Sequence, residues 1–409
     1  MRSESARLMN RHNAGDRWRV FVLESCNSLA TAIYFFHLFF FTQKKFGFGD
    51  RENLALAASH GLVYAMFSSL GGSYGQRKGY PQALRIGFSI MGLCMFAGAL
   101  VDGLVPHIAL MLLWTFGMCF TWPSLEAMAS QGANPAELPR RVGIYNMVWA
   151  VSCAAANFFG GALIEIFGSK SSFWIPVALH ATQLLLLSLP SSPGLASPVQ
   201  QPSEPPDPFP GLNPRPIART RTFLHLSWVA NPFAYIAINT VVPVIPTLAA
   251  KFGLSPAGTG FFCSIWYFAR FAAFYTLWRW TGWHYRQGWF FLAYGMLLVG
   301  FLGLLLASQI WIVVISQVIL GLALGLIYYS SLFYSMDAGD THGEHGGFHE
   351  AAIGAGIFAG PAVGAISMTL MPTSLNAAVV AVFGLLVVGL AVLLVIRRRS
   401  GEMKVGAIG

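Results

Sequence analysis

The sequence predicts an all-α membrane protein in which twelve transmembrane helices form two pseudo-symmetric six-helix bundles. Three observations predict this fold: the composition, the number of long apolar runs, and a proline-rich break between the sixth and seventh runs. Of the 409 residues, 55% are hydrophobic and 10% are charged, whereas a soluble domain carries about 25% charged residues. So few charged side chains cannot cover a water-facing surface, so most of the surface is expected to face lipid.

A helix needs roughly 20 apolar residues to cross a bilayer. The chain offers six such runs before the break and six after it. They lie near residues 20–41, 54–74, 84–103, 108–128, 143–166, 172–189, 224–250, 259–280, 288–306, 310–334, 348–370 and 375–396. Prolines at 232, 243 and 246 are expected to interrupt the seventh run, and broken membrane helices often line a transport pathway.

The break spans residues 190–221 and is crowded with proline. Proline removes a backbone donor and clashes with the preceding helical turn, so this segment is expected to be an extended or disordered linker. The predicted organisation is therefore an N-terminal bundle (1–189), a cytoplasmic linker (190–221) and a C-terminal bundle (222–409).

Lysine and arginine show which side of the membrane each loop occupies. Most of them fall in the N-terminal segment, the linker, the C-terminal segment and alternate loops. The opposite side holds only Lys44, Lys45, Arg51, Lys170 and Lys251. Cytoplasmic loops are enriched in basic residues, so both termini are predicted to be cytoplasmic, in the plasma (inner) membrane. The first apolar run is too long for a signal peptide, and no cleavage site follows it.

Other classes of protein lack support in the sequence. The net charge of +9 is explained by orientation, and without an RNP-like motif or a basic recognition helix no nucleic-acid partner is expected. No phosphate-binding loop, H-E-x-x-H or G-x-S-x-G motif occurs, so neither an ATP-driven pump nor an enzyme is predicted, and no cofactor. The five cysteines lie within apolar runs without a C-x-x-C pair and are interpreted as small buried hydrophobes.

The two halves share short sequence matches. The tripeptide KFG follows the first apolar run at 45–47 and the seventh at 251–253. The fifth run contains ANFFGG at 156–161, and the eleventh contains the similar GIFAGP at 356–361. Together with the six-plus-six arrangement, these matches indicate two parallel repeats, which transporters use to enclose a central site.

The segment between the second and third runs, GSYGQRKG at 72–79, resembles the G-x-L-a-D-R-x-G loop of the major facilitator superfamily. Gly72, Arg77 and Gly79 match that pattern, and Gln76 stands where the family usually has aspartate. In the family this aspartate pairs with basic residues at the cytoplasmic gate. Because glutamine carries no charge, such a gate salt bridge is not expected here.

The eleventh run carries Gly356, Gly360, Pro361 and Gly364, similar to the G-x-x-x-G-P-x-x-G element of the same family. Small residues at every fourth position let helices approach closely in lipid, and a proline can kink the helix. Tight packing and a hinge are both compatible with this pattern. The fourth run lacks the arginine motif typical of drug–proton antiporters.

Four charged residues are expected within the membrane: Glu24, Glu126, Arg270 and Glu350. A charge there costs about 3 kcal/mol or more, so each needs a partner or a water-filled cavity. Arg270 lies nine residues before Arg279, which places it about 13 Å inside the membrane at 1.5 Å per residue. It could bind an anionic substrate group, act as counter-ion to Glu126 or Glu350, or form a purely structural pair.

Buried carboxyl groups can exchange protons near neutral pH, which makes Glu24 and Glu126 candidates for proton coupling. Either could instead extend to the membrane surface. Asn27 and Tyr34 in the first run, and Asn231 and Asn239 in the seventh, are candidate polar contacts for a substrate.

Residues 336–351 hold Asp, Glu and His side chains without a Lys or Arg. His345 and His349 are four apart and would share a helical face. The segment is compatible with a metal site, a pH sensor, or a surface loop whose His349 and Glu350 begin the eleventh helix. The glycines favour the loop, and no metal site is predicted.

These features predict a secondary active transporter that moves a small organic molecule by alternating access, coupled to protons and working as a monomer. A non-transporting receptor or scaffold on a transporter fold is the alternative. A membrane-embedded enzyme would need a catalytic pair at the membrane surface, and only the Asp/His segment offers one.

Overall fold

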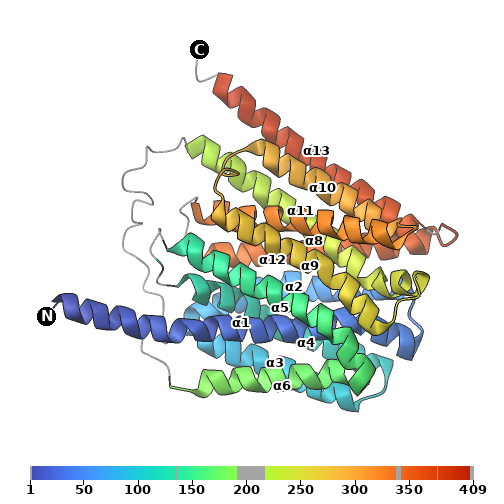
Figure 1. The fold of residues 1–409 in the computed structure, drawn as a ribbon. Helices are drawn as coiled ribbons and strands as arrows, with labels where there is room; N and C mark the ends of the chain where they lie inside the picture. The colour runs from blue at the N-terminus through green and yellow to red at the C-terminus, as the bar shows by residue number, and fades with distance from the viewer. Residues whose placement is uncertain are drawn as a thin grey trace.

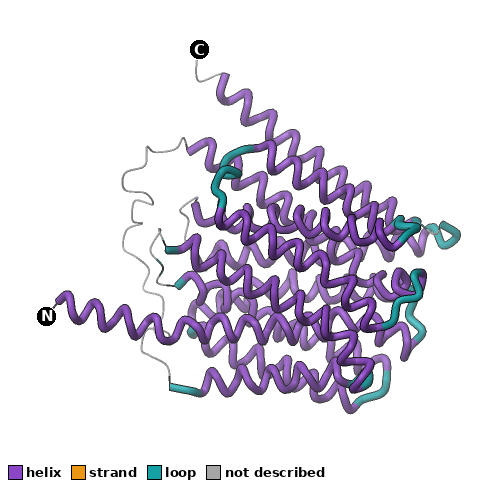
Figure 2. Tube along the Cα trace, in the orientation of Figure 1, coloured by secondary structure: helices purple, strands orange, loops and turns teal. Residues whose placement is uncertain are grey.

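The computed structural model describes the backbone of residues 2–131, 133, 137–190, 217–337, 342–374 and 376–405. Within these segments all regular structure is helical (Figures 1 and 2), and all twelve predicted helices are present. The helices of the first half are α1 (Arg2–Phe46), α2 (Asp50–Lys78), α3 (Tyr80–Leu100), α4 (Leu104–Ser130), α5 (Leu138–Phe167) and α6 (Ser171–Ser188). Those of the second half are α8 (Ile217–Lys251), α9 (Pro256–Arg279), α10 (Gln287–Leu305), α11 (Ile310–Asp337), α12 (His342–Leu370) and α13 (Ala377–Val405).

Ten of these described helices are long and apolar enough to cross a bilayer. The other two, α1 and α9, are less apolar because they carry polar side chains such as Glu24, Asn27 and Arg270 inside the bundle. In lipid, an α-helix satisfies its own backbone hydrogen bonds, which explains why every long apolar run became a helix. The two least apolar helices thus mark where polar groups face the protein interior.

The helices run roughly antiparallel, and both chain ends lie at the same end of the bundle (Figure 1). We call this the terminal end, and we call the end with the turns at 46–50, 100–104, 167–171, 251–256, 305–310 and 370–377 the distal end. The two halves meet most extensively where α2 packs along α12 and α5 packs along α9. The linker predicted at 190–221 lies largely outside the described residues.

The repeated KFG tripeptide has the same structural role in both halves. Gly47 after α1 and Gly253 after α8 both have positive φ, +70° and +63°, as expected where glycine terminates a helix. The preceding lysine then reaches the loop between the third and fourth helices of its own half. Lys45 Nζ lies 2.8 Å from Asp102 Oδ1, and Lys251 Nζ donates to the Ala307 carbonyl at 2.6 Å. The halves are therefore pseudo-symmetric, as predicted.

The glycines of the eleventh run lie against α8. A Cβ atom on Gly356 would lie 2.3 Å from the Pro232 carbonyl oxygen, and one on Gly360 would lie 2.5 Å from that of Ile236. Gly364 instead faces Leu54 of the other half. These glycines permit backbone approaches that no larger residue would allow.

This close packing predicts that Gly360→Ala lowers the melting temperature of the purified protein. The added methyl group must push α12 away from α8, at a cost of about 1–3 kcal/mol. The matched control is Gly384→Ala on α13, where an added Cβ meets nothing within 4 Å and alanine is the better helix former by up to about 1 kcal/mol. Equal melting temperatures for the two variants would contradict this packing role.

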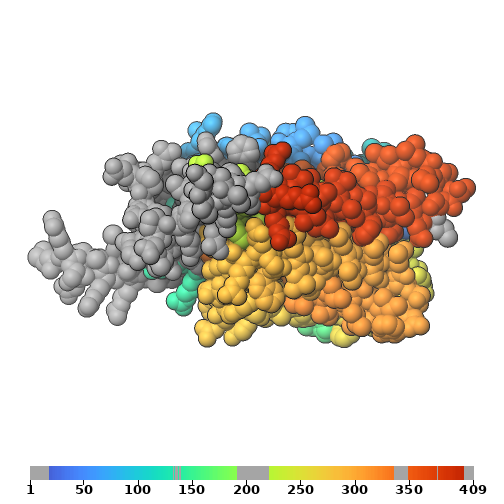
Figure 3. Space-filling model, turned by 90° about the horizontal axis from the view of Figure 1, so that it is seen from above, coloured from blue at the N-terminus to red at the C-terminus, as the bar shows by residue number. Residues whose placement is uncertain are grey.

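The outside of the bundle is apolar. Figure 3 shows one face of the molecule, on which α13 (red) lies uncovered. Val380, Val388 and Val395 of α13 are 67%, 55% and 49% exposed. Exposed apolar area on this scale is typical of a lipid-facing surface.

Three local predictions were wrong. The helix α8 is continuous across Pro232, Pro243 and Pro246, because neighbouring helices can satisfy the groups that proline frees in a membrane bundle. The segment 72–78 is the last part of α2, so Gly79 alone, with φ +98°, makes the turn into α3. The helix α12 begins at His342 and not at His349; side chains of 336–348 lie outside the described residues.

Candidate functional site

Two carboxyl groups, one from each half, meet inside the bundle. Glu126 comes from α4, and Glu350, only 4% exposed, comes from α12. The Tyr328 hydroxyl of α11 donates to Glu126 Oε1 at 3.1 Å, and the Tyr64 hydroxyl of α2 donates to Glu350 Oε2. Each tyrosine therefore bonds to the carboxyl group of the opposite half. We call these four residues the carboxyl pair and its tyrosines.

The two carboxyl groups of the pair interact electrostatically with each other. Neighbouring like charges repel in a low-dielectric interior, so ionising both carboxyl groups is unfavourable. A proton shared between the two groups removes this repulsion. The arrangement can therefore hold and release a proton between the two halves.

Glu24 of α1 adds a third carboxyl group near this pair. Its side chain is fully buried, with 0% exposure, so it does not extend to the membrane surface. The Ser28 hydroxyl donates to Glu24 Oε1 at 2.7 Å, while Oε2 has no protein partner. Tyr145 and Glu350 are electrostatic neighbours of Glu24, which places Glu24 at the edge of the same site.

Arg270 of α9 lies among aromatic rings. Its guanidinium carbon lies 4.3 Å from the Trp149 ring centroid, 5.0 Å from that of Tyr328 and 5.5 Å from that of Phe274. Within the described residues no carboxylate lies within ion-pair distance of Arg270. Because the Tyr328 hydroxyl bonds to Glu126, the Tyr328 ring connects the arginine to the carboxyl pair.

Hydrogen bonds also join the two halves near the distal end. The Thr247 hydroxyl of α8 donates to Asp50 Oδ1 at 2.5 Å. Glu165 Oε1 of α5 accepts from the backbone N–H of Ala257, in the first turn of α9, at 2.9 Å. The amide of Asn53 donates to the Pro243 carbonyl at 3.3 Å. These three hydrogen bonds bridge the two halves at the distal end.

Comparison with known proteins identifies the family. The profile described as Major Facilitator Superfamily matches residues 20–232, just over half of the chain. The chain belongs to the major facilitator superfamily.

Solved structures of major facilitator transporters share this fold at low sequence identity. A mutant of the nucleoside transporter NupG has a TM-score of 0.70 and 13% identity, covering 93% of this chain and 99% of NupG. A proton-dependent oligopeptide transporter has a TM-score of 0.66 and 15% sequence identity, and the match covers 94% of this chain and 99% of that transporter. A bacterial homologue of the human lysosomal transporter Spinster, in an inward-facing and occupied conformation, has a TM-score of 0.62 and 14% sequence identity. The match covers 95% of this chain and 97% of the homologue. No curated protein matches the sequence.

The major facilitator loop motif is altered in structure as well as in sequence. Gln76 and Arg77 lie on the last turn of α2, with Gln76 half-buried and Arg77 exposed. In the described part of the chain Arg77 forms no ion pair. The loop therefore lacks the gate salt bridge that the family pattern implies, in agreement with the glutamine at position 76.

Two buried amides have no protein partner. Asn27 of α1 is 0% exposed and Asn231 of α8 is 1% exposed, and neither the oxygen nor the nitrogen of either amide is hydrogen-bonded. Buried polar groups are normally satisfied. These amides on the first helix of each half are therefore available to a substrate or to water.

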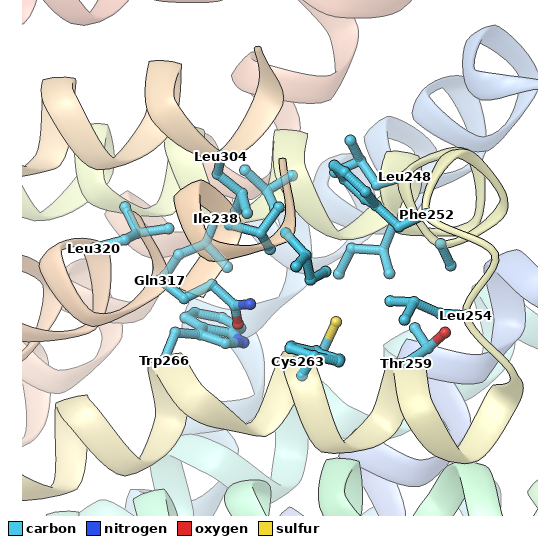
Figure 4. A pocket seen from close by; sticks show the side chains of 16 residues that line it. Ile238, Leu248, Phe252, Leu254, Thr259, Cys263, Trp266, Leu304, Gln317 and Leu320 are labelled. Atoms are coloured by element: carbon cyan, nitrogen blue, oxygen red, sulfur yellow. The ribbon is translucent and has the colours of Figure 1, made fainter. Parts of the chain in front are cut away.

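An apolar cavity of about 40 Å³ lies within the second half and is separate from the carboxyl pair. Figure 4 shows its lining, with the amide of Gln317 beside Trp266 and with Ile238 and Leu304 on other sides. The lining holds no charged side chain. It has room for about one water-sized group, and we assign it no role in charge handling.

Sequence reasoning selected the charged residues but missed most of their partners. Tyr64, Tyr328 and Ser28 were not singled out, because a hydroxyl in an apolar run is common and its partner is invisible in one sequence. Asp50 and Asn53 of the distal contacts were also missed. Their position at the start of a membrane helix gave no sign that the other half would lie against them.

Proposed function

We propose that this major facilitator protein is a secondary active transporter that moves a small organic molecule by alternating access and couples the movement to protons. The coupling residues are Glu126 and Glu350. The observation that carries the proposal is the reciprocal bonding of Tyr328 to Glu126 and of Tyr64 to Glu350 across the two halves. With cytoplasmic termini in the plasma membrane, the distal end faces outward.

The coupling follows from the chemistry of these bonds. An ionised carboxylate accepts a stronger hydrogen bond than a neutral acid. With one proton shared, the pair carries a single negative charge, which strengthens the tyrosine hydrogen bonds and holds the halves together on its side of the membrane. A second proton neutralises the pair and loosens both bonds. A proton taken up from outside would favour closure of the distal end and opening of the cytoplasmic end.

The distal contacts complete the cycle. In the structure the distal end is bridged by Asp50–Thr247 and Glu165–Ala257, while the carboxyl pair and its tyrosines are also bonded. Both sets are present at once, as expected of an occluded state. Rocking of the halves would break one set at a time, which is the requirement for alternating access.

Distances between spin labels test this function without knowledge of the substrate. One label pair, at Lys44 and Ser308, reports on the distal end, and another, at Lys78 and Arg286, reports on the terminal end; all four side chains are exposed. The five buried cysteines are replaced in the background. On acidification we expect the Lys78–Arg286 distance to increase and the Lys44–Ser308 distance to decrease.

The opposite response of the two pairs is the diagnostic result. If neither distance changes with pH or with added ligands, the halves do not alternate. A receptor or scaffold on a transporter fold then becomes the better interpretation. If both distances increase together, the protein is loosening, and proton-coupled rocking is excluded.

A further inference from the structure

Arg270 is a buried cation with no counter-ion among the residues that the structure describes. It is 2% exposed, and it is the only lysine or arginine among the buried residues that the structure describes. Its Nε atom has no hydrogen-bond partner, and the described ion pairs involve Lys45, Arg51 and Arg141 instead. A buried charge without an ionic partner is strongly unfavourable, so an anion bound beside Arg270 would be stabilising.

The aromatic rings around Arg270 compensate its charge only in part. Trp149 and Tyr328 come from opposite halves, and their ring planes are 13° apart with centroids separated by 6.2 Å. Tyr267 lies beside Trp149, with ring centroids 6.1 Å apart. Ring faces attract a cation, but more weakly than an anion would in the same place. Aromatic rings beside the guanidinium also offer apolar contact area to the body of a bound organic anion.

We propose that Arg270 binds the anionic group of a small organic monoanion whose flat apolar body packs against Trp149 and Tyr328. This inference rests on the proposed transport function and names its substrate class. A guanidinium fits a carboxylate or sulfonate through two parallel hydrogen bonds.

The charge of the site limits the class further. A phosphate ester carries close to two negative charges at neutral pH, and one buried guanidinium cannot balance it. Glu24, Glu126 and Glu350 lie in the same region, and their ionised forms would repel a dianion. A monoanion that moves together with one proton transfers no net charge across the membrane. One buried arginine for the anion and one carboxyl pair for the proton would provide the two binding sites that such transport needs.

Binding to the purified protein in detergent tests this inference. The probes are benzoate, benzamide and benzylammonium, which share one ring and differ in charge, and the measurements are the melting temperature and the quenching of tryptophan fluorescence. We expect benzoate to bind and to raise the melting temperature, and the other two to have little effect. Arg270→Gln should weaken benzoate binding by about 10- to 100-fold, and Arg270→Lys by less.

The stability of the ligand-free variant provides a second readout. Removing an unpaired buried charge should leave Arg270→Gln at least as stable as the wild type, so loss of binding would not reflect misfolding. The matched control is Arg279→Gln at the exposed end of the same helix, which should bind benzoate normally. Equal binding of benzamide and benzoate, unchanged binding by Arg270→Gln, or no binding of benzoate would each overturn the inference.

Failure of this inference can be told apart from failure of the proposed function. If the label distances alternate with pH but benzoate does not bind, the protein is a transporter of another substrate class. If benzoate binds through Arg270 but the distances do not alternate, the site is real and the transport proposal is wrong.

Discussion

Proton-driven accumulation of an anion should be abolished in the Glu350→Gln variant. One coupled proton supports about tenfold accumulation per pH unit, so a gradient of about two units supports up to about 100-fold. Glutamine keeps the shape of the side chain and can still accept the Tyr64 hydrogen bond, but it does not titrate. Accumulation of radiolabelled benzenesulfonate in proteoliposomes should therefore fall to about the external concentration, while exchange of labelled for unlabelled probe persists.

Benzenesulfonate is chosen because it stays ionised, so the pH gradient cannot trap it by passive diffusion. The control is Asp102→Asn, which removes an exposed carboxylate whose pKa is held below its usual range by Lys45; it should accumulate the probe like the wild type. Full accumulation by Glu350→Gln would remove the carboxyl pair from the coupling mechanism. The pH response of the spin-label distances should vanish in the same variant, whichever substrate is used.

Weakening the distal contacts should shift the protein toward a state open at the distal end. Thr247→Val removes the hydroxyl that bonds to Asp50, and Glu165→Ala removes the acceptor for the Ala257 N–H. Both hydrogen bonds are exposed to solvent, so each is expected to contribute about 0.5–1.5 kcal/mol, and the double variant should change the ratio of closed to open molecules by about 10-fold. The Lys44–Ser308 label pair should then report the longer distance at neutral pH.

A matched substitution separates this effect from general loosening. Thr276 on α9 donates only within its own helix, to Ala272, so Thr276→Val should leave the distance distribution unchanged. If the double variant keeps the closed distance, the distal hydrogen bonds are incidental to closure. The glycine contacts between the halves, such as Gly161 against the Pro256 carbonyl, would then be the stronger restraint.

The membrane fold was predictable because its main requirement is local. Lipid provides no hydrogen-bond partners, so each crossing must be a continuous apolar helix, and each predicted run appears as one. The boundaries were less predictable: α2 continues through Lys78 and α12 begins at His342, because polar residues can extend a helix beyond the apolar core. The prolines in α8 did not interrupt the helix as predicted, because neighbouring helices can satisfy the backbone groups that proline leaves free.

The candidate site was predictable in its charges but not in its pairings. Glu24, Glu126, Arg270 and Glu350 stand out in the sequence because a charge in an apolar run is costly. The sequence alone does not decide whether Arg270 serves as counter-ion to a glutamate or lies among aromatic rings. The ring contacts of Arg270 and the absence of a described carboxylate within ion-pair range favour the second arrangement.

The sequence by itself determined the number of membrane helices, their division into two halves and the identity of the charged residues inside them. These features depend on the transfer of each segment from water to lipid, which is a property of the segment alone. The tertiary structure decided that Tyr64 meets Glu350, 286 positions away along the chain. It also decided that Arg270 meets aromatic rings and, among the described residues, no carboxylate within ion-pair distance. Such contacts depend on how each helix is rotated and packed against the other half, and no local stretch of sequence contains that information.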